Sequence, residues 1–269
     1  MNHHHDDGSK MQEVDVIVCT RNSEATLEEC LQSIKENIPY HRLIVVDGMS
    51  SDETCRIAKR FGAEIHSEAL GLSYARELGI ALTDCPFLAY VDSDVVITEN
   101  WYAAVMSELQ EPTVGSAQGF LVPLDRERRQ FFEFWHKIIK GKKEGFQTHN
   151  TIIRTEAVKD WHPGILTNYY EFTLLANHIR SKGYRIVEVK HQTWHLSQWS
   201  NHHAFNAGKA YTRIFGFKIH KLLWRLLTPI KTIPPAVFYR NPKVLTRYTQ
   251  YWLAYARGMI SEYCSTKSA

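Results

Sequence analysis

The chain has 269 residues, which is long enough for one large domain or two small ones. Its 44% hydrophobic and 23% charged residues are typical of a globular protein and exclude collagen-like, low-complexity and wholly disordered chains. The 32 Lys and Arg against 29 Asp and Glu leave a net charge of only +3, so we predict no nucleic-acid partner.

The N-terminal residues, the cysteines and the apolar runs together predict where in the cell the protein lies. Residues 1–10 contain His3, His4 and His5 and are interpreted as an expression tag, outside the fold. The five cysteines form no metal-ligand spacing, and their odd number without a signal peptide predicts reduced, buried thiols: Cys19, Cys30, Cys55, Cys85 and Cys264. Because no apolar run reaches about 18 residues, we predict no membrane-spanning segment. The predicted location is cytoplasmic, and the basic amphipathic segments described below place it peripherally on the cytoplasmic face of the membrane.

The first half of the chain reads as an α/β unit. From residue 14 to about residue 122, short β-branched runs alternate with helical patterns, which predicts βαβ units and a mostly parallel sheet. The predicted strands are residues 15–19, 43–46, 64–66 and 87–91, and the predicted helices are residues 25–38, 52–61 and 73–82.

After Pro123 the chain becomes basic and aromatic, and the strand signal is weak until residues 184–189. Residues 126–143 are predicted to form a basic amphipathic helix with the cations Arg126, Arg128, Arg129, Lys137, Lys140, Lys142 and Lys143. Since there is no fixed repeat and no low-complexity linker, the two halves are expected to share one fold.

The sharpest local signal is Asp92-Ser93-Asp94, directly after the apolar strand 87–91. Ligands of open α/β sheets gather beyond the carboxyl ends of the strands. Mg²⁺ and Mn²⁺ bind through one or two carboxylates together with substrate phosphates, so Asp92 and Asp94 are candidate metal ligands. The alternative is a solvated turn.

Two other predicted strands also end in polar residues. The first runs into Thr20, Arg21 and Asn22 at the start of a helix, and the second ends at Asp47 before an acidic, glycine-containing turn. We expect Asp47 to bond a nucleobase or ribose, while the metal and diphosphate lie at Asp92 and Asp94. Ser51 and Asp52 are expected to cap the following helix.

These motifs resemble the family 2 glycosyltransferases of the GT-A fold, a Rossmann-like α/β fold whose members transfer a sugar from a nucleotide diphosphate with inversion. The resemblance covers roughly residues 14–195. The stretch 45–54 is similar to the family's VVDDGSxDGT, with Gly48 and Glu53 as departures, and Gly71 to Arg76 looks like its G-x-x-x-A-R helix. It implies a UDP-sugar donor and nucleotide-binding residues at Thr20, Arg21, Asn22, Asp47, Arg76 and Ser93.

Inversion by single displacement needs a general base for the acceptor hydroxyl. The resemblance implies a carboxylate pair ahead of a Gly-Tyr-x-Ile strand start, where this chain has Glu171 and then Phe172. Because Phe172 stands where the family commonly has its basic Asp, either Glu171 is the base, as we predict, or the register shifts and another group acts. A first-turn helix acid is the alternative role for Glu171. His195 is predicted to complete the metal site or meet the diphosphate, with His191 and His202-His203 as weaker competitors.

The C-terminal part is predicted to contain two helices, residues 214–230 and 243–263, separated by prolines. The first has an apolar side (Phe215, Ile219, Leu222, Leu223, Leu226, Ile230) and a basic side (Lys218, Lys221, Arg225), and the second is rich in tyrosine and tryptophan (Tyr248, Tyr251, Trp252, Tyr255). Such segments lie at membrane interfaces, so contact with an anionic membrane is predicted. The alternative is packing on the catalytic domain or on a second subunit.

Together these features predict a GT-A catalytic domain over residues 11–200 and a helical, amphipathic extension over residues 201–269. The predicted activity is a metal-dependent, inverting sugar transfer to a hydroxyl or phosphate of a glycan or a polyprenyl-phosphate-type acceptor. One alternative is a phosphatase of the haloacid dehalogenase type, because Asp92 to Val96 resembles its nucleophile motif. Another is a non-catalytic nucleotide-sugar-binding module. The oligomeric state is not predicted.

Overall fold

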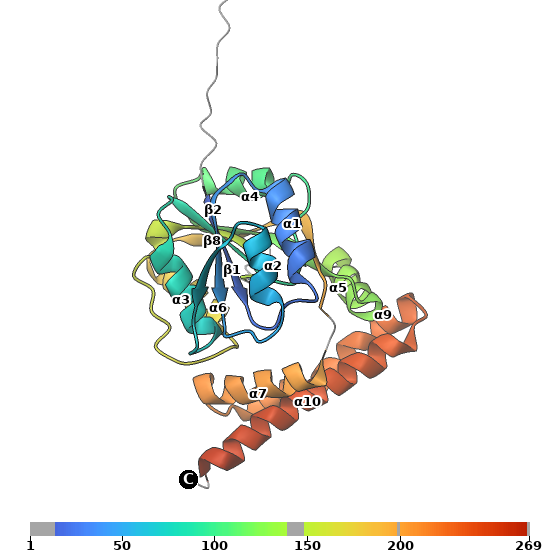
Figure 1. Ribbon diagram of the computed structural model, residues 1–269. Helices are drawn as coiled ribbons and strands as arrows, with labels where there is room; N and C mark the ends of the chain where they lie inside the picture. Colours follow the sequence, from blue (N-terminus) through green and yellow to red (C-terminus); the bar gives the residue numbers. More distant parts are fainter. Residues whose placement is uncertain (1–13, 139–147, 198–199, 268–269) are drawn as a thin grey trace, which may run out of the picture.

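The computed structural model describes residues 14–138, 148–197 and 200–267. The expected tag at residues 1–10 lies outside the described residues, as do Lys140, Lys142 and Lys143 at the end of the predicted basic helix. An α/β layer and a layer of C-terminal helices make up the described part (Figure 1).

Within the described residues, eight strands form one sheet in the order β3-β2-β1-β4-β7-β6-β8-β5. Four pairings are parallel (β1 with β2 and β4, β2 with β3, β6 with β8), whereas β7 runs antiparallel to β4 and β6, and β5 to β8. The predicted α/β fold with a mostly parallel sheet is confirmed. The strands are β1 (Val14–Thr20), β2 (Tyr40–Asp47), β3 (Glu64–Ser67), β4 (Phe87–Val91), β5 (Val95–Val96), β6 (Val114–Pro123), β7 (Asn150–Arg154) and β8 (Arg185–His195).

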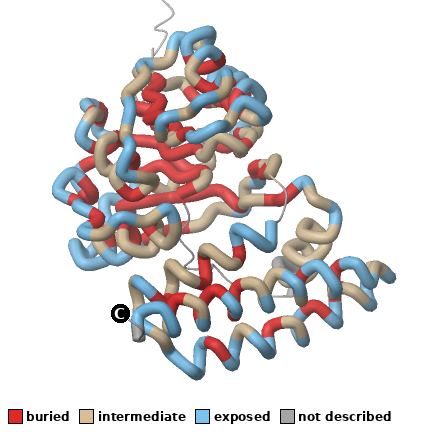
Figure 2. Tube along the Cα trace, turned by 60° about the horizontal axis from the view of Figure 1, so that its bottom comes forward, coloured by how far each residue is buried: buried red, intermediate tan, exposed pale blue. Residues whose placement is uncertain are grey.

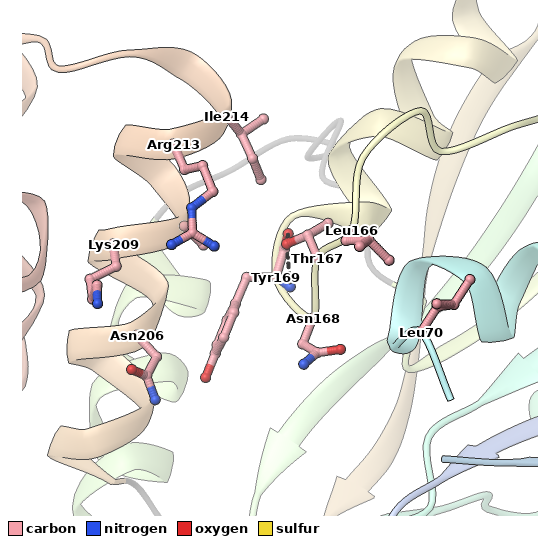
Figure 3. A pocket seen from close by; sticks show the side chains of 10 residues that line it. Leu70, Leu166, Thr167, Asn168, Tyr169, Asn206, Lys209, Arg213 and Ile214 are labelled. Carbon is pink, nitrogen blue, oxygen red and sulfur yellow. Dashed lines mark hydrogen bonds between the residues drawn. The ribbon is translucent and has the colours of Figure 1, made fainter. Parts of the chain in front are cut away.

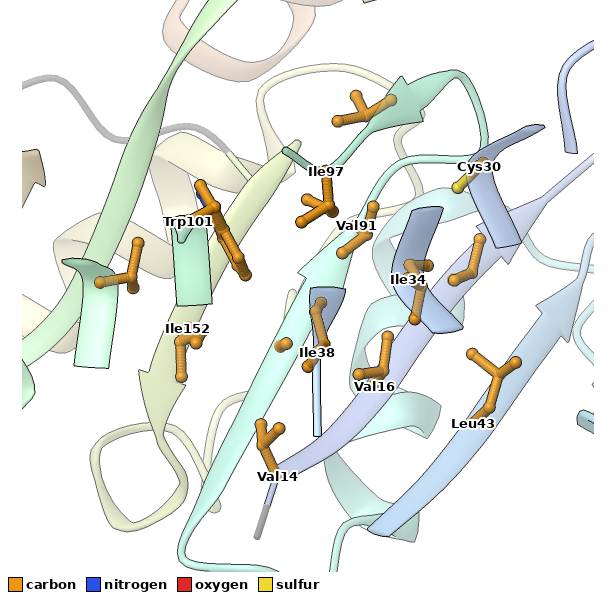
Figure 4. Packing of buried hydrophobic residues seen from close by; sticks show 14 of the residues in the cluster. Val14, Val16, Cys30, Ile34, Ile38, Leu43, Val91, Ile97, Trp101 and Ile152 are labelled. Atoms are coloured by element: carbon orange, nitrogen blue, oxygen red, sulfur yellow. The ribbon is translucent and has the colours of Figure 1, made fainter. Parts of the chain in front are cut away.

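Helices cover both faces of the sheet. Alternate residues of β1 point to opposite faces, so Val16 and Val18 join the core beneath α1, α2 and α4 (Figure 4), while Ile17 joins the core beneath α3 and α6. Burial on both faces explains why β1 reads as an unbroken apolar run. These helices are α1 (Leu27–Asn37), α2 (Thr54–Arg60), α3 (Leu72–Leu82), α4 (Trp101–Leu109) and α6 (Glu171–Ser181), and α5 (Arg126–Ile138) lies beside the C-terminal layer.

The C-terminal layer is held together by a close helix pair, α7 (Asn201–Phe215) and α10 (Pro242–Lys267) (Figure 1). A Cβ added at Gly208 of α7 would lie 2.0 Å from the Tyr255 carbonyl oxygen of α10, and one at Gly258 would lie 2.0 Å from that of Phe205. Glycine at both positions therefore allows the two backbones to touch. Along the chain, α7 is connected to α10 by α8 (Ile219–Leu227), the 3₁₀ turn η2 (Thr228–Thr232) and α9 (Ile233–Phe238).

The predicted continuous helix over residues 214–230 is wrong. Gly216, with φ of 74°, ends α7, and α8 begins only at Ile219. Leu222 is buried, but most of the apolar side chains of this region are exposed, and Figure 2 shows exposed stretches along the C-terminal helices. Packing of this apolar side on the catalytic domain is therefore not observed. No helix in the described ranges is long and apolar enough to cross a bilayer.

Candidate active site

The ends of β1 and β2 form a hydrogen-bonded loop pair. Thr20 Oγ1 donates to Asp47 Oδ1 (2.9 Å), and the Ser50 N–H donates to Asp47 Oδ2 (2.8 Å). Burial raises the pKa of Asp47, but the hydrogen bonds from Ser50 and Thr20 outweigh it and hold the pKa below its ordinary value. Asn22, in a left-handed conformation, accepts from the Ser51 N–H (2.9 Å). In this structure these predicted nucleotide residues fix the loops.

A cleft of about 270 Å³ opens beside these loops, lined by Thr20, Arg21 and Gly48 among others. Ser23 and Ser93 join the β1 loop to the Asp-x-Asp turn through their hydroxyls (3.0 Å). The predicted cap Asp52 accepts from the Thr54 N–H (3.1 Å) just ahead of α2. No described hydrogen bond shows Ser51 capping through its side chain.

Arg76, buried on α3, links two carboxylates. Its Nη2 donates to Asp92 Oδ1 (2.9 Å) and its Nε to Glu171 Oε1 (3.4 Å). The second oxygen of Asp92 is in hydrogen-bond contact with His149 Nδ1. Both oxygens of Asp92 are thus engaged by cationic or ring-nitrogen donors.

The pKa values of this group follow from burial and charge. Burial disfavours the charged form of Asp92, but His149 and Arg76 outweigh it and hold the pKa of Asp92 far below its ordinary value. Burial raises the pKa of Glu171, and Arg76 opposes this only in part. His149 has its pKa raised by Asp92 against the effect of burial. Asp92 is therefore held ionised, while Glu171 binds protons more readily than a free glutamate.

Asp94 faces His195 at the end of β8, with 3.3 Å between Asp94 Oδ2 and His195 Nε2. Burial lowers the pKa of His195 to about 4, which keeps the imidazole neutral at pH 7. Arg128 Nη1 donates to His195 Nδ1 (3.1 Å), so the proton of the neutral ring lies on Nε2, facing Asp94, and would have to leave before a metal binds that nitrogen. A carboxylate oxygen beside a neutral imidazole nitrogen is a donor set that suits Mn²⁺.

One cavity of about 540 Å³ collects the predicted chemical residues: Arg76, Asp92, Asp94, Glu171 and His195 line it. His203 lines it too, whereas His191 contacts the Glu99 carbonyl outside it. The structure brings together the predicted base and metal residues with Arg76. Of the other predicted nucleotide residues, Thr20 and Arg21 line the neighbouring cleft, whereas Asn22, Asp47 and Ser93 do not.

Several lining residues were not identified from the sequence as part of this site. His149 precedes β7, a strand without a clear sequence signal, although a His-Asn pair ahead of Ile152 and Ile153 is the available hint. The sequence places Arg128 in a basic amphipathic helix without a role in the site, but its Nη1 donates to His195 Nδ1 at 3.1 Å. Three of the four aromatic residues of α10 that were predicted at a membrane interface, Tyr251, Trp252 and Tyr255, line the cavity.

A mostly parallel α/β sheet with a cleft at its carboxyl edge and an Asp-x-Asp turn beside it defines a glycosyltransferase of the GT-A class. The chain belongs to glycosyltransferase family 2, because the model of that family, Glycosyl transferase family 2, matches residues 15–168, more than half of its length. Family membership decides against the phosphatase alternative.

Relatives and solved structures agree with this class. The 4,4'-diaponeurosporenoate glycosyltransferase of Staphylococcus haemolyticus is 32% identical over 102 residues, 35% of this chain and 27% of that protein. An N-acetylglucosaminyltransferase of Bradyrhizobium elkanii is 30% identical over 130 residues, 44% of this chain and 71% of that protein. The alignment thus spans only about a quarter of the staphylococcal enzyme.

Glucosyl-3-phosphoglycerate synthase from Mycobacterium tuberculosis, crystallised with phosphoglyceric acid, has a similar structure. The TM-score is 0.58 at 17% identity, over 76% of this chain and 80% of that chain. Another crystal structure of that synthase, with Mn²⁺, UDP-glucose and phosphoglyceric acid, gives a TM-score of 0.57 at 17% identity over 76% and 79% of the two chains. At 17% identity, the structural similarity establishes the fold alone.

Proposed function

We propose that the protein is a metal-dependent, inverting glycosyltransferase that moves a sugar from a nucleotide-diphosphate donor, with uridine favoured, to a hydroxyl or phosphate of an acceptor. The observation that carries this proposal is the meeting of Asp94 and His195 in the same cavity as the Asp92–Arg76–Glu171 chain. The solved relatives that hold UDP-glucose and Mn²⁺ support the donor class.

For the donor, we assign the nucleoside to the cleft beside Thr20 and Arg21, next to the loops held by Asn22 and Asp47. Ser93 lies in the turn between this cleft and the metal position. Arg76 would meet the diphosphate from within the larger cavity while holding Asp92 and Glu171 in place. The donor would then lie across the carboxyl edge of β1, β2 and β4.

For the metal, we assign Asp94 and His195 as direct ligands of Mg²⁺ or Mn²⁺, and the imidazole nitrogen favours Mn²⁺ because Mg²⁺ prefers oxygen ligands. Asp92 bonds Arg76 through one oxygen and His149 through the other, and each oxygen keeps a second lone pair; its role as a ligand stays a prediction. The bound ion would supply neutralisation of the charge that develops on the departing diphosphate.

Glu171 takes the role of general base. It begins α6, lines the cavity, and has a raised pKa, which strengthens it as a proton acceptor. The proton of the acceptor hydroxyl passes to a carboxylate oxygen of Glu171 as the hydroxyl oxygen attacks the anomeric carbon. Phe172 has no group that can replace it.

A second cavity, of about 410 Å³, supports an anionic acceptor (Figure 3). Lys209 and Arg213 project from α7 toward the loop that carries Asn168 and Tyr169, and these two loop residues also line the large cavity. Glu262 is the one described acid that pairs with both cations (Lys209 at 3.8 Å, Arg213 at 2.9 Å), which leaves an excess positive charge. A phosphate-bearing acceptor of the polyprenyl-phosphate type fits this charge; a lipid-linked glycan is the alternative.

The exposed surface of the C-terminal layer supports peripheral contact with an anionic membrane. No Asp or Glu occurs between Glu188 and Glu262, whereas that stretch contains eleven Lys and Arg. The exposed large apolar residues of the same stretch are Ile219, Leu223, Trp224, Leu226, Leu227, Ile230, Ile233, Val237, Phe238, Leu253 and Ile260. Apolar side chains interleaved with cations bind anionic lipid, which is the reason for placing the protein on the cytoplasmic face.

We keep the division into a catalytic domain over residues 11–200 and an extension over residues 201–269 as part of this proposal. The extension supplies Tyr251, Trp252 and Tyr255 to the large cavity. It therefore contributes to the site as well as to the proposed membrane surface.

The test is a thermal-shift series with UDP, GDP and ADP, each with and without Mn²⁺, followed by an assay of UDP-sugar hydrolysis. We expect Mn²⁺ to enlarge the shift given by the preferred nucleotide. The enlargement should vanish in Asp94→Ala and persist in Glu29→Ala, an exposed acid on α1. A shift that survives Asp94→Ala would place the metal elsewhere, and binding without any turnover would favour the non-catalytic module.

A further inference from the structure

A cluster of three metal-binding side chains lies at the edge of the sheet opposite the proposed donor site. Asp15 comes from the start of β1, His41 from the start of β2, and Cys85 from the turn before β4. Thr20, at the nucleotide edge, is five positions after Asp15 along β1, which at about 3.3 Å per residue is roughly 17 Å. The cluster is therefore separate from the Asp94 and His195 pair.

The distances among the three donor atoms match a tetrahedral zinc site. Asp15 Oδ1 lies 3.2 Å from His41 Nδ1 and 3.5 Å from Cys85 Sγ, and the sulfur lies 3.5 Å from His41 Nδ1. Tetrahedral Zn²⁺, with bonds of about 2.0 Å to nitrogen and oxygen and about 2.3 Å to sulfur, separates N and O by about 3.3 Å and either from S by about 3.5 Å. The three atoms already form one face of such a tetrahedron.

Hydrogen bonds to the other oxygen of Asp15 fix the orientation of its carboxylate. Oδ2 accepts from Arg42 Nη2 (3.2 Å) and from the backbone N–H groups of Asp84 (2.9 Å) and Cys85 (3.3 Å). Oδ1 is thereby turned toward His41 and Cys85. Partners of this kind orient the ligands of protein metal sites.

Charge and access also suit a divalent cation. The Asp15 carboxylate and a Cys85 thiolate together would balance two positive charges. Arg42 is met by two further carboxylates, Asp84 (3.0 Å) and Glu64 (3.6 Å), so its charge is compensated without Asp15. The His41 side chain is 46% exposed while Asp15 is fully buried, which leaves one open side for the ion and a water.

We propose that Asp15, His41 and Cys85 bind one Zn²⁺ ion, with water as the fourth ligand, in a site that ties β1, β2 and the turn before β4 together. On binding, the Cys85 thiol releases its proton to solvent and the thiolate sulfur forms the bond to zinc, without any change of oxidation state. Sulfur and nitrogen donors favour Zn²⁺ over Mg²⁺, which prefers oxygen.

The test is a Co²⁺ titration of the full chain after treatment with EDTA, followed by absorption. A thiolate bound to Co²⁺ gives a near-ultraviolet charge-transfer band that imidazole ligands, including those of His3 to His5, do not give. We expect this band to saturate at one equivalent and to be displaced by Zn²⁺. It should be absent in Cys85→Ser and kept in Cys264→Ser, the matched variant of the exposed thiol on α10.

Two further measurements separate binding from folding. Cys85→Ser replaces one atom, so its circular dichroism and its Tm in EDTA should equal those of the wild type, while Zn²⁺ should raise the Tm only of the wild type and Cys264→Ser. His41→Ala should weaken Co²⁺ binding at least about tenfold. Absence of the thiolate band in the wild type, or its persistence in Cys85→Ser, would mean that the three residues form a hydrogen-bonded triad only.

Discussion

Arg76→Met is the substitution that most directly tests the charge arrangement of the proposed site. Methionine keeps much of the length of arginine but removes the guanidinium that bonds Asp92 and Glu171. Arg76 is only 1% exposed, so water cannot take its place without rearrangement. The variant would leave two carboxylates facing one buried position.

The expected cost follows from burial and from the groups that remain. Opposite charges about 3 Å apart attract by roughly 5 kcal/mol at an effective dielectric constant of about 20, and removing one partner of a buried pair costs about 3 to 5 kcal/mol. Two features favour the lower end: Glu171 can take up a proton because burial raises its pKa, and Asp92 keeps His149. We therefore expect about 3 kcal/mol, or a Tm lower by about 6 to 12 °C.

The assay is urea unfolding at pH 7 with Tm measured in parallel. The control is Arg56→Met, which removes an exposed cation paired with Glu53 and should cost less than about 1 kcal/mol. In the double variant Arg76→Met/Glu171→Gln one of the stranded carboxylates is gone, so part of the loss should be recovered. The reasoning fails if Arg76→Met costs no more than Arg56→Met, or if the double variant shows no coupling.

Three other outcomes are expected. Gly208→Ala should destabilise the protein by about 2 to 3 kcal/mol in urea unfolding, because its Cβ would meet a backbone carbonyl of α10 at 2.0 Å. Helix propensity alone predicts the opposite, a gain of about 1 kcal/mol. The control Gly62→Ala, with open space but φ of +74°, should cost only about 1 to 2 kcal/mol. Glu171→Gln should lower kcat by about 10² to 10⁴-fold and leave donor binding unchanged. In the wild type the base must be deprotonated to act, and burial raises its pKa. The rate of the wild type should therefore fall as the pH is lowered, with a midpoint above pH 4.5. Leu223→Ser should reduce the fraction of protein that sediments with anionic vesicles at low salt. Leu124→Ser, which changes a similarly exposed leucine outside the C-terminal layer, should leave that fraction unchanged. Equal binding by the two variants would contradict the membrane proposal.

The parts of this site that follow from local sequence were predictable. The Asp-x-Asp turn was identified because it directly follows β4, an apolar run buried on both faces, and Thr20 and Asp47 because they end β1 and β2 in the same way. Parallel strands bring such ends to one edge whatever the rest of the chain does. Glu171 follows from the resemblance to the family's carboxylate pair ahead of a Gly-Tyr-x-Ile strand start.

The rest depends on contacts between distant segments, which periodicity does not report. His149 reaches Asp92 because β7 inserts antiparallel between β4 and β6, and the carbonyl of His149 accepts the Asp92 N–H (3.0 Å). Arg128 reaches His195 because α5 begins where β6 ends, beside β8. A basic amphipathic pattern is compatible with a surface helix or a cavity wall, and only the packing chooses between them.

The same packing explains how a small net charge can coexist with two strongly charged regions. Acidic residues meet at the carboxyl edge of the sheet, where Arg76, His149 and the Asp94–His195 contact hold them in an arrangement suited to a diphosphate and a metal. Residues 201–269 contain eleven Lys and Arg and one acid, Glu262, and the layer they form has an aromatic face on the cavity and an exposed outer face. A donor and an anionic acceptor would therefore approach from opposite sides of one cavity, and the loop carrying Asn168 and Tyr169, which lines both cavities, is the place where they would meet.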